Sequence, residues 1–293
     1  MKILRKVFNK SKKLWLRFIS DKINIIRMKN LNVALLNFII KAYYEIKNQN
    51  FSENEKEYIK KIEIIRYKYL NSKKSIDYKD FGAGSPNSDA SENILVKNKL
   101  IHNICKASIP FKKAILLFKV VRNLKPNNCL ELGTCLGISS SYISSALQLN
   151  QKGFLFTIEG DPQLAALSEK NFQELNLKNI KVFAGRFQDI LDEVLKKHNP
   201  IDFVFIDGHH TEKATLKYFN IIFPYLSDRS ILIFDDIKWS NGMNRAWKRI
   251  KTNQKVNFSI DLGEMGIIFI LKEKIKKKHF KMLLLSDFKN FKF

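Results

Sequence analysis

The chain has 293 residues, 45% of them hydrophobic, so it can bury a sizeable core and lacks the composition of an intrinsically disordered protein. Its formal net charge of +24 lies outside residues 129–270, where 16 basic residues balance 16 acidic ones, and comes from flanks with 36 basic and 12 acidic residues. The charge therefore does not mark residues 129–270 as a nucleic-acid surface. Three explanations of the basic flanks stay open: a lysine-rich composition without a partner, contact with an anionic membrane surface, and binding of nucleic acid.

Cysteine usage and the apolar segments bear on where the protein is located. Cys105, Cys129 and Cys135 are odd in number and lack the spacing of a metal site, which is typical of reduced thiols in a cytoplasmic protein. No apolar segment follows the basic N-terminus, so we expect no signal peptide, and the apolar segment 31–40 is too short to span a bilayer. We therefore expect a cytoplasmic protein, with peripheral membrane contact through the N-terminal arm as one option.

Residues 1–80 are predicted to be a basic helical extension, because apolar residues recur at helical spacing between positions 25 and 39. An amphipathic helix on an anionic surface and a helical cap on the chain's own domain are both consistent with this pattern, and we favour the cap for residues 30–70. The glycine-rich and polar segment 81–93 ends the helical pattern, and within it residues 82–85 are a candidate lid. A helix is predicted at 112–124, before Pro126.

Strands and helices alternate from residue 129 onward. Short apolar strands are predicted at 129–132, 154–158, 180–184, 202–206 and 230–234, and helices at 139–149, 162–175, 187–197, 212–226 and 241–252. This alternation predicts an α/β fold with a Rossmann-like, doubly wound, mostly parallel sheet. The last two strands, 256–262 and 266–271, are too close for a parallel crossover and must form an antiparallel hairpin. We therefore predict a seven-stranded domain at 81–272 and a basic tail at 273–293.

A glycine turn follows the first of these strands. Glu131, Gly133 and Gly137 form an E-x-G-x-x-x-G pattern that leads into the helix beginning near Ser139. Glycine permits a tight turn and close approach of a ligand, and the helix N-terminus favours a small anionic group. An ordinary tight connection between a strand and a helix would have the same pattern.

Acidic and aromatic residues follow the next two strands. Glu159 ends the second strand, where a carboxylate can accept hydrogen bonds from both hydroxyls of a ribose. Phe187 and Gln188 follow the third strand, and an aromatic ring next to a carboxamide suits an adenine. Helix capping and packing are the alternative explanation for these two residues.

Five segments, taken in order, resemble the motifs of class I S-adenosylmethionine (SAM)-dependent methyltransferases: LELG at 130–133, TIE at 157–159, GRFQD at 185–189, VFIDG at 204–208 and FDD at 234–236. The most similar group is the small-molecule O-methyltransferases that include catechol O-methyltransferase. The whole run 81–272 also resembles a set of uncharacterised methyltransferases from Bacteroidetes-type bacteria. The resemblance implies SAM as cofactor, bound by Glu131, Gly133, Gly137, Ser139, Glu159, Phe187, Gln188 and Asp207.

The catechol-type resemblance also implies a magnesium ion held by Asp207, Asp235 and Asp236. Asp236 departs from the family, which has a neutral asparagine there. The alternative is that Asp207 binds the methionyl ammonium group and Asp235 shapes the pocket. The family's general base, a lysine, corresponds to His210 here, beside His209, and a neutral imidazole can accept a proton from a hydroxyl group. Asp207, His209 and His210 are therefore the candidate catalytic residues.

These patterns predict O-methylation of a small hydroxylated metabolite or a glycan-like acceptor. The Asp-Gly-His-His sequence at 207–210 disfavours methylation of nucleic-acid bases, which usually depends on an Asn/Asp-Pro-Pro-aromatic loop at this place. Two alternatives stay open: a SAM-binding module without turnover, tethered by its basic arm, and an RNA methyltransferase that grips phosphates with its basic flanks.

Overall fold

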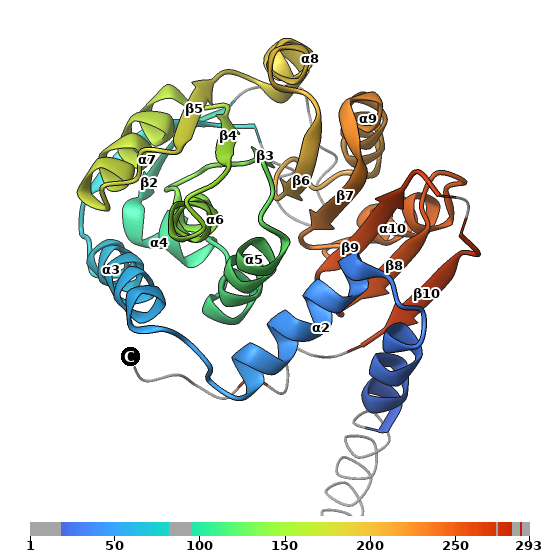
Figure 1. Cartoon of the computed structure of the whole chain (residues 1–293). Helices are drawn as coiled ribbons and strands as arrows, with labels where there is room; N and C mark the ends of the chain where they lie inside the picture. Colours follow the sequence, from blue (N-terminus) through green and yellow to red (C-terminus); the bar gives the residue numbers. More distant parts are fainter. Residues whose placement is uncertain (1–18, 82–94, 274, 283–287, 289–293) are drawn as a thin grey trace, which may run out of the picture.

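The computed structural model of the chain describes residues 19–81, 95–273, 275–282 and 288. Its centre is an eight-stranded sheet with the order β10-β8-β9-β7-β6-β3-β4-β5 (Figure 1). Only β9 runs antiparallel to its neighbours, β7 and β8. The strands are β3 (Asn128–Leu132), β4 (Phe154–Glu159), β5 (Ile180–Ala184), β6 (Ile201–Ile206), β7 (Leu226–Phe234), β8 (Phe258–Asp261), β9 (Gly266–Leu271) and β10 (Lys278–Lys281). The predicted Rossmann-like sheet and its antiparallel hairpin are confirmed.

Helices cover both faces of this sheet (Figure 1). Alternate strand residues point to opposite faces, as Cys129 and Leu130 of β3 show by belonging to different hydrophobic clusters. One face carries α8 (Phe187–His198), α9 (Glu212–Ile222) and α10 (Asn241–Thr252), and the other carries α5 (Phe111–Leu124), α6 (Ile138–Leu149) and α7 (Pro162–Glu174). Because both faces are buried, the inner strands β3, β4, β6 and β9 are almost continuously apolar, which is why they could be recognised in the sequence.

The N-terminal helices are part of the same hydrophobic core. Residues 19–29, α2 (Ala34–Lys47) and α3 (Glu53–Leu70) add apolar side chains to the cluster that α5 and α6 form with the sheet. A buried ion-pair group also joins α3 to α5, since Glu55 accepts hydrogen bonds from Lys119 Nζ at 2.8 Å and from Arg122 Nε at 2.9 Å. This arrangement agrees with the favoured helical cap for residues 30–70.

Four short elements were not predicted from the sequence. They are β1 (Ser75–Asp80), β2 (Leu95–Leu100), α4 (Ile101–Lys106) and β10, which pairs in parallel with β8 inside the predicted tail. The strands β1 and β2 form an antiparallel hairpin, and Lys79 N donates to Asp161 Oδ2 at 2.8 Å, just after β4. All four elements are short and carry polar or basic residues, so their form depends on the neighbours they meet rather than on a periodic apolar pattern.

Some sequence predictions lie outside the described residues. These are the basic arm up to residue 18 and the candidate lid at 82–85, so the membrane contact of the arm stays a prediction. Among the helices of the described part of the chain, none combines the length and the apolar character needed to cross a membrane. The boundaries at 81 and 272 also stay predictions.

Candidate active site

The loops after four neighbouring parallel strands meet at one edge of the sheet. Backbone hydrogen bonds continue between neighbours one residue beyond the strands, from Gly133 N to Ile158 O at 3.0 Å and from Asp207 N to Leu132 O at 2.9 Å. Asp235 N likewise donates to Ile206 O at 2.9 Å. The residues that follow β3, β4, β6 and β7 are therefore held side by side at the carboxyl edge, where open α/β sheets bind their ligands.

The two glycines of the turn are required for different reasons. Gly133 has φ +103°, and a Cβ atom there would lie 2.1 Å from the carbonyl oxygen of Asp207, so a side chain is excluded. Gly137, at φ +75°, precedes α6, and a Cβ atom there would lie 2.6 Å from the ring of Phe172 on α7. The open side of Gly137 is thus filled by Phe172, whereas the sequence predicted close approach of a ligand.

We expect Gly133→Ala to lower the free energy of unfolding by about 1–3 kcal/mol, because the backbone would be strained and the Asp207 carbonyl would have to move. Gly242→Ala is the matched control, since a Cβ atom on Gly242 of α10 would meet no atom closer than 3.5 Å. That change should leave stability the same or raise it by about 0.5–1 kcal/mol. Urea unfolding of both variants measures the difference, and equal stabilities would contradict this role of Gly133.

Glu131 is fully buried at the end of β3 and faces α6. Its Oε2 atom accepts hydrogen bonds from Ser140 and, at 2.6 Å, from Thr157 Oγ1. Its Oε1 atom is buried and has no hydrogen-bond partner among the described residues. Burial raises the pKa of Glu131 to about 7, above the ordinary value of 4.5. An unpartnered acceptor of this kind fits a ligand that brings a hydrogen-bond donor to the edge of the sheet.

The raised pKa of Glu131 makes stability depend on pH. Between pH 4.5 and about 7 the folded chain keeps a proton that the unfolded chain releases, so the free energy of unfolding should fall as the pH rises through this window. The share due to Glu131 is on the order of 3 kcal/mol. Urea unfolding at the two ends of the window should show a smaller fall for Glu131→Gln than for the unaltered chain. The same fall in both proteins would contradict the assignment.

Glu159 ends β4, and its buried carboxylate holds the turn after β3. Its Oε2 atom accepts a hydrogen bond from Cys135 N at 2.7 Å, and its Oε1 atom accepts one from Asp161 N at 3.0 Å. Burial raises the pKa of this carboxyl, and the backbone donors oppose the rise. Each carboxylate oxygen has a second lone pair, so Glu159 can still accept hydrogen bonds from a diol.

Three other predicted cofactor residues stand at the first turns of α6 and α8. Ser139 is buried in the first turn of α6. Phe187, at the start of α8, is half-buried and packs edge-on against Tyr218, with ring centroids 5.4 Å apart. Its ring also lies against Gly208, where a Cβ atom would be only 2.9 Å away. Gln188 is exposed, so its carboxamide is free to meet a ligand.

Asp207 and the two histidines lie together after β6. His210 Nε2 is 3.6 Å from Asp207 Oδ1, and His209 Nδ1 is 3.0 Å from the hydroxyl of Tyr218 on α9. Burial lowers the pKa of both histidines, so both rings are neutral at neutral pH. Burial and then the carboxylate of Asp235 raise the pKa of Asp207 well above its ordinary value. A neutral imidazole is suited to accept a proton from a hydroxyl group.

The predicted magnesium site is not supported, because a buried lysine forms ion pairs with two of its three predicted ligands. Lys113 Nζ lies 2.6 Å from Asp235 Oδ1 and 3.4 Å from Asp236 Oδ1. Burial alone would lower the pKa of Lys113, but the surrounding carboxylates, Asp235 above all, raise it above its ordinary value. Within the described ranges, no group of three or more His, Cys, Asp or Glu side chains is arranged to hold a metal ion.

The sequence held only a weak signal for Lys113. It is the second of two adjacent lysines near the start of α5, well upstream of the motifs, and its side chain is 6% exposed. A charged residue on a buried helix face needs a partner of opposite charge, but the pattern does not say which one.

The aromatic residues after Asp236 divide between the site and the core. Trp239 is exposed, and its ring centroid lies 6.4 Å from that of His210. Met243 and Trp247 are buried in α10, and Trp247 packs against Gly266 of β9. Trp239 is therefore positioned to meet an acceptor, whereas Met243 and Trp247 belong to the core.

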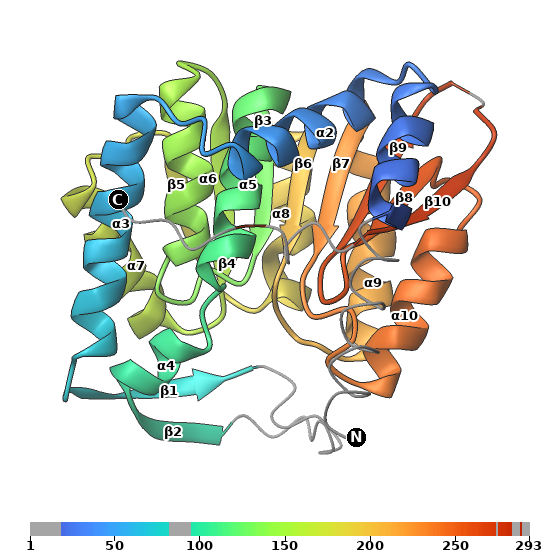
Figure 2. The ribbon, with the colours of Figure 1, turned by 90° about the horizontal axis from the view of Figure 1, so that it is seen from below.

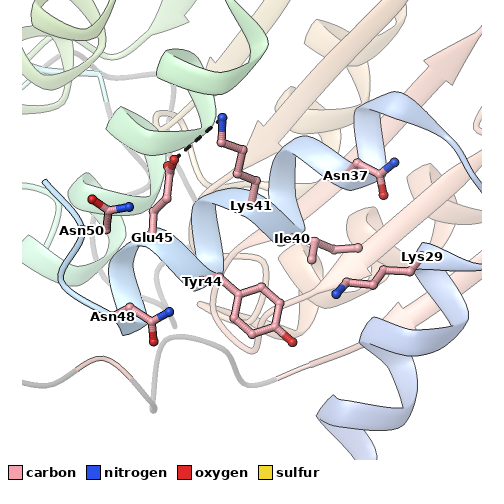
Figure 3. Close-up of a pocket in the computed structure, with 8 residues that line it drawn as sticks. All are labelled: Lys29, Asn37, Ile40, Lys41, Tyr44, Glu45, Asn48 and Asn50. Atoms are coloured by element: carbon pink, nitrogen blue, oxygen red, sulfur yellow. Dashed lines mark ion pairs between the residues drawn. The ribbon is translucent and has the colours of Figure 1, made fainter.

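A separate open hollow of about 440 Å³ lies along α2 (Figure 3). The residues that line it come mainly from α2: Lys29, Asn37, Ile40, Lys41, Tyr44, Glu45, Asn48 and Asn50. The helix α2 and the β1–β2 hairpin lie at opposite ends of the molecule (Figure 2). This hairpin is hydrogen-bonded to the loop after β4 and therefore lies at the carboxyl edge of the sheet. The hollow is thus remote from that edge.

Comparisons with known proteins agree with this geometry. Residues 130–237 match the model of a methyltransferase domain family. A catechol O-methyltransferase of Niastella koreensis is 38% identical over 83 residues, which are 28% of this chain and 37% of that protein. The chain thus matches well under half the length of this relative.

Solved structures show the same fold. An O-methyltransferase of Bacillus cereus in complex with SAH aligns with a TM-score of 0.51 and 22% identity, over 58% of this chain and 85% of that one. An SAH-bound methyltransferase of Podospora anserina aligns with a TM-score of 0.51 and 15% identity, over 58% and 82%. At such identities the likeness concerns the fold. Together with the domain match, it shows that residues 130–237 are similar to a methyltransferase domain and that the chain has the fold of these methyltransferases.

Proposed function

We propose that the chain transfers a methyl group from SAM to a hydroxyl oxygen of a small-molecule or glycan-like acceptor. The observation that carries this proposal is the meeting of Glu159, the Gly133 turn and the Asp207–His210 loop at one edge of the sheet. That edge offers hydrogen-bond acceptors for a cofactor. Next to them it offers a neutral base for the hydroxyl group of the molecule that is methylated. The loops of open α/β folds bind ligands at this edge.

The cofactor would be held by residues of the first four loops. Glu159 binds the ribose hydroxyls with the lone pairs that its backbone donors leave free. Phe187 and Gln188 contact the adenine. The methionyl end lies by the Gly133 turn and the start of α6, with its ammonium group near Asp207 and the unpartnered oxygen of Glu131. Gly137 and Ser139 complete the shape of this turn.

His210 is the proposed general base, with Asp207 beside it and Trp239 next to its ring. SAM supplies a methyl group on a positively charged sulfur. As the acceptor oxygen forms its bond to the methyl carbon, the carbon–sulfur bond breaks, its electron pair stays on sulfur, and the hydroxyl proton moves to His210. The chain thus aligns the reacting atoms and removes a proton, and no step passes through magnesium.

Release of S-adenosylhomocysteine from SAM, measured across a panel of phenols, catechols, hydroxy acids and sugars, tests this function. We expect at least one acceptor to give turnover, and His210→Gln to lower kcat by about 10²- to 10⁴-fold while the affinity for SAM is kept. His209→Gln is the neighbouring control and should have the smaller effect on kcat. Tight SAM binding with no turnover on any acceptor would instead favour a SAM-binding module without catalysis.

A further inference from the structure

Three carboxylate oxygens surround the ammonium group of Lys113. Asp235 Oδ1 lies at 2.6 Å, Asp236 Oδ1 at 3.4 Å and Glu264 Oε2 at 3.4 Å from Lys113 Nζ. The carboxylates come from the loop after β7 and from the turn between β8 and β9, and the lysine comes from α5. The side chains of Lys113 and Asp235 are 6% and 4% exposed. This is a built cation position, and a side chain of the protein fills it.

This geometry also separates the three metal ligands that the catechol-type resemblance implies, because they have different partners. Asp235 and Asp236 bind Lys113, whereas Asp207 Oδ1 lies 3.6 Å from Nε2 of the neutral His210 ring. A divalent ion bound by Asp235 and Asp236 would lie next to the ammonium group of Lys113, and two neighbouring cations repel strongly in a buried site. The lysine would therefore have to leave before a metal could bind.

We propose that Lys113 is the resident cation of the acceptor site and takes the place of the divalent metal. Lys113 then acts as a positioning residue: its fixed charge neutralises and orients Asp235 and Asp236 beside the Asp207–His210 loop. The inference concerns the site of the proposed function and rests on it. Without a metal that chelates two neighbouring oxygens, the acceptor needs only the hydroxyl group that is methylated, so a vicinal diol is not required.

The first test is binding of Mn²⁺, a paramagnetic substitute for Mg²⁺, to the full chain with and without S-adenosylhomocysteine. Free Mn²⁺ is followed by electron paramagnetic resonance, and we expect the unaltered chain to leave the free signal unchanged. A loss of signal that Asp236→Ala abolishes would overturn the proposal, since alanine, unlike asparagine, offers no oxygen ligand. A loss that persists in Asp236→Ala comes from another place on the chain and leaves the acceptor site metal-free, as proposed.

The second test removes the resident cation. Lys113→Met leaves three carboxylates without their shared ammonium group, so we expect this variant, unlike the unaltered chain, to bind Mn²⁺. Lys113→Arg keeps a cation and should bind none. A folded Lys113→Met protein that binds no Mn²⁺ would contradict a cation position at this place. If Lys113→Met does not fold, the measurement on the unaltered chain and Asp236→Ala decides the question.

Calorimetric titration of S-adenosylhomocysteine into the same samples separates the two proposals. Failure to bind S-adenosylhomocysteine would refute the proposed function, whatever Mn²⁺ does. If the unaltered chain binds S-adenosylhomocysteine and also binds Mn²⁺, and Asp236→Ala loses the Mn²⁺, the proposed function stands and only the resident cation is refuted.

Discussion

Glu159→Ala is expected to raise the dissociation constant for SAM on the order of 100-fold. In the proposed complex the carboxylate accepts hydrogen bonds from two ribose hydroxyls, and hydrogen bonds to a charged group contribute about 1.5–3 kcal/mol each. The same side chain also holds Cys135 N and Asp161 N, so its loss loosens the turn that the cofactor would touch. Isothermal titration calorimetry with SAM measures the change directly.

Glu174→Ala is the matched control for this measurement. Glu174 ends α7 and is about half exposed, with Lys68 Nζ at 3.3 Å from its carboxylate. Its removal deletes a surface carboxylate without touching the sheet edge, so the affinity for SAM should stay the same. If Glu159→Ala also keeps the affinity of the unaltered chain, the ribose assignment is wrong. Thermal unfolding of both variants shows whether any loss comes from misfolding instead.

Lys113→Met is expected to lower the free energy of unfolding by about 3–5 kcal/mol. Removing one partner of a buried ion pair leaves the other charge uncompensated, and Asp235 is only 4% exposed. The ammonium group of Lys113 also serves Asp236 and Glu264, so their mutual repulsion would add to the loss. Urea unfolding gives the difference in free energy.

An exposed ion pair of similar length provides the comparison for Lys113. Lys61 Nζ lies 2.6 Å from Glu57 Oε1 on α3, and the Lys61 side chain is 52% exposed. Water screens such a pair, so Lys61→Met should cost at most about 1 kcal/mol. The double variant Lys113→Met/Asp235→Asn should recover part of the stability lost in Lys113→Met, because it removes the stranded charge. No recovery would mean that Lys113 stabilises the fold through packing rather than through Asp235.

The sequence alone was sufficient to predict the strands of the central sheet and the helices that pack on it, because packing on the sheet requires a regular apolar pattern. The predicted bounds of α10 and β9 agree with the structure, because their apolar residues are buried and recur with the period of a helix or form a continuous run in a strand. The bounds of β5 also agree, although this edge strand has no fully buried residue. The hairpin of β8 and β9 followed from the length of the predicted connecting loop alone, since three residues cannot form a parallel crossover. The β1–β2 hairpin and β10 could not be predicted, because their residues are polar and gain their form from neighbours distant in sequence.

Some residues of the candidate site could be predicted from the sequence and others could not. A residue directly after a parallel strand must lie at the carboxyl edge, so the positions of Glu159, Asp207 and Asp235 followed from the strand pattern. Side chains that reach this edge from elsewhere left no such signal. Lys113 arrives from a helix 122 positions before Asp235, and Tyr218 meets His209 from α9. The predicted magnesium site gained no support for this reason: the strand pattern indicated its carboxylates but not Lys113, which forms ion pairs with two of them.

A crystal structure of the full chain with S-adenosylhomocysteine tests the central claim most directly. We expect the ligand at the carboxyl edge, with the ribose hydroxyls within hydrogen-bond distance of Glu159, the adenine beside Phe187 and Gln188, and the sulfur facing the Asp207–His210 loop. Lys113 should remain between Asp235 and Asp236. A ligand bound elsewhere, for example in the hollow along α2, or a ribose that does not touch Glu159, would contradict the account.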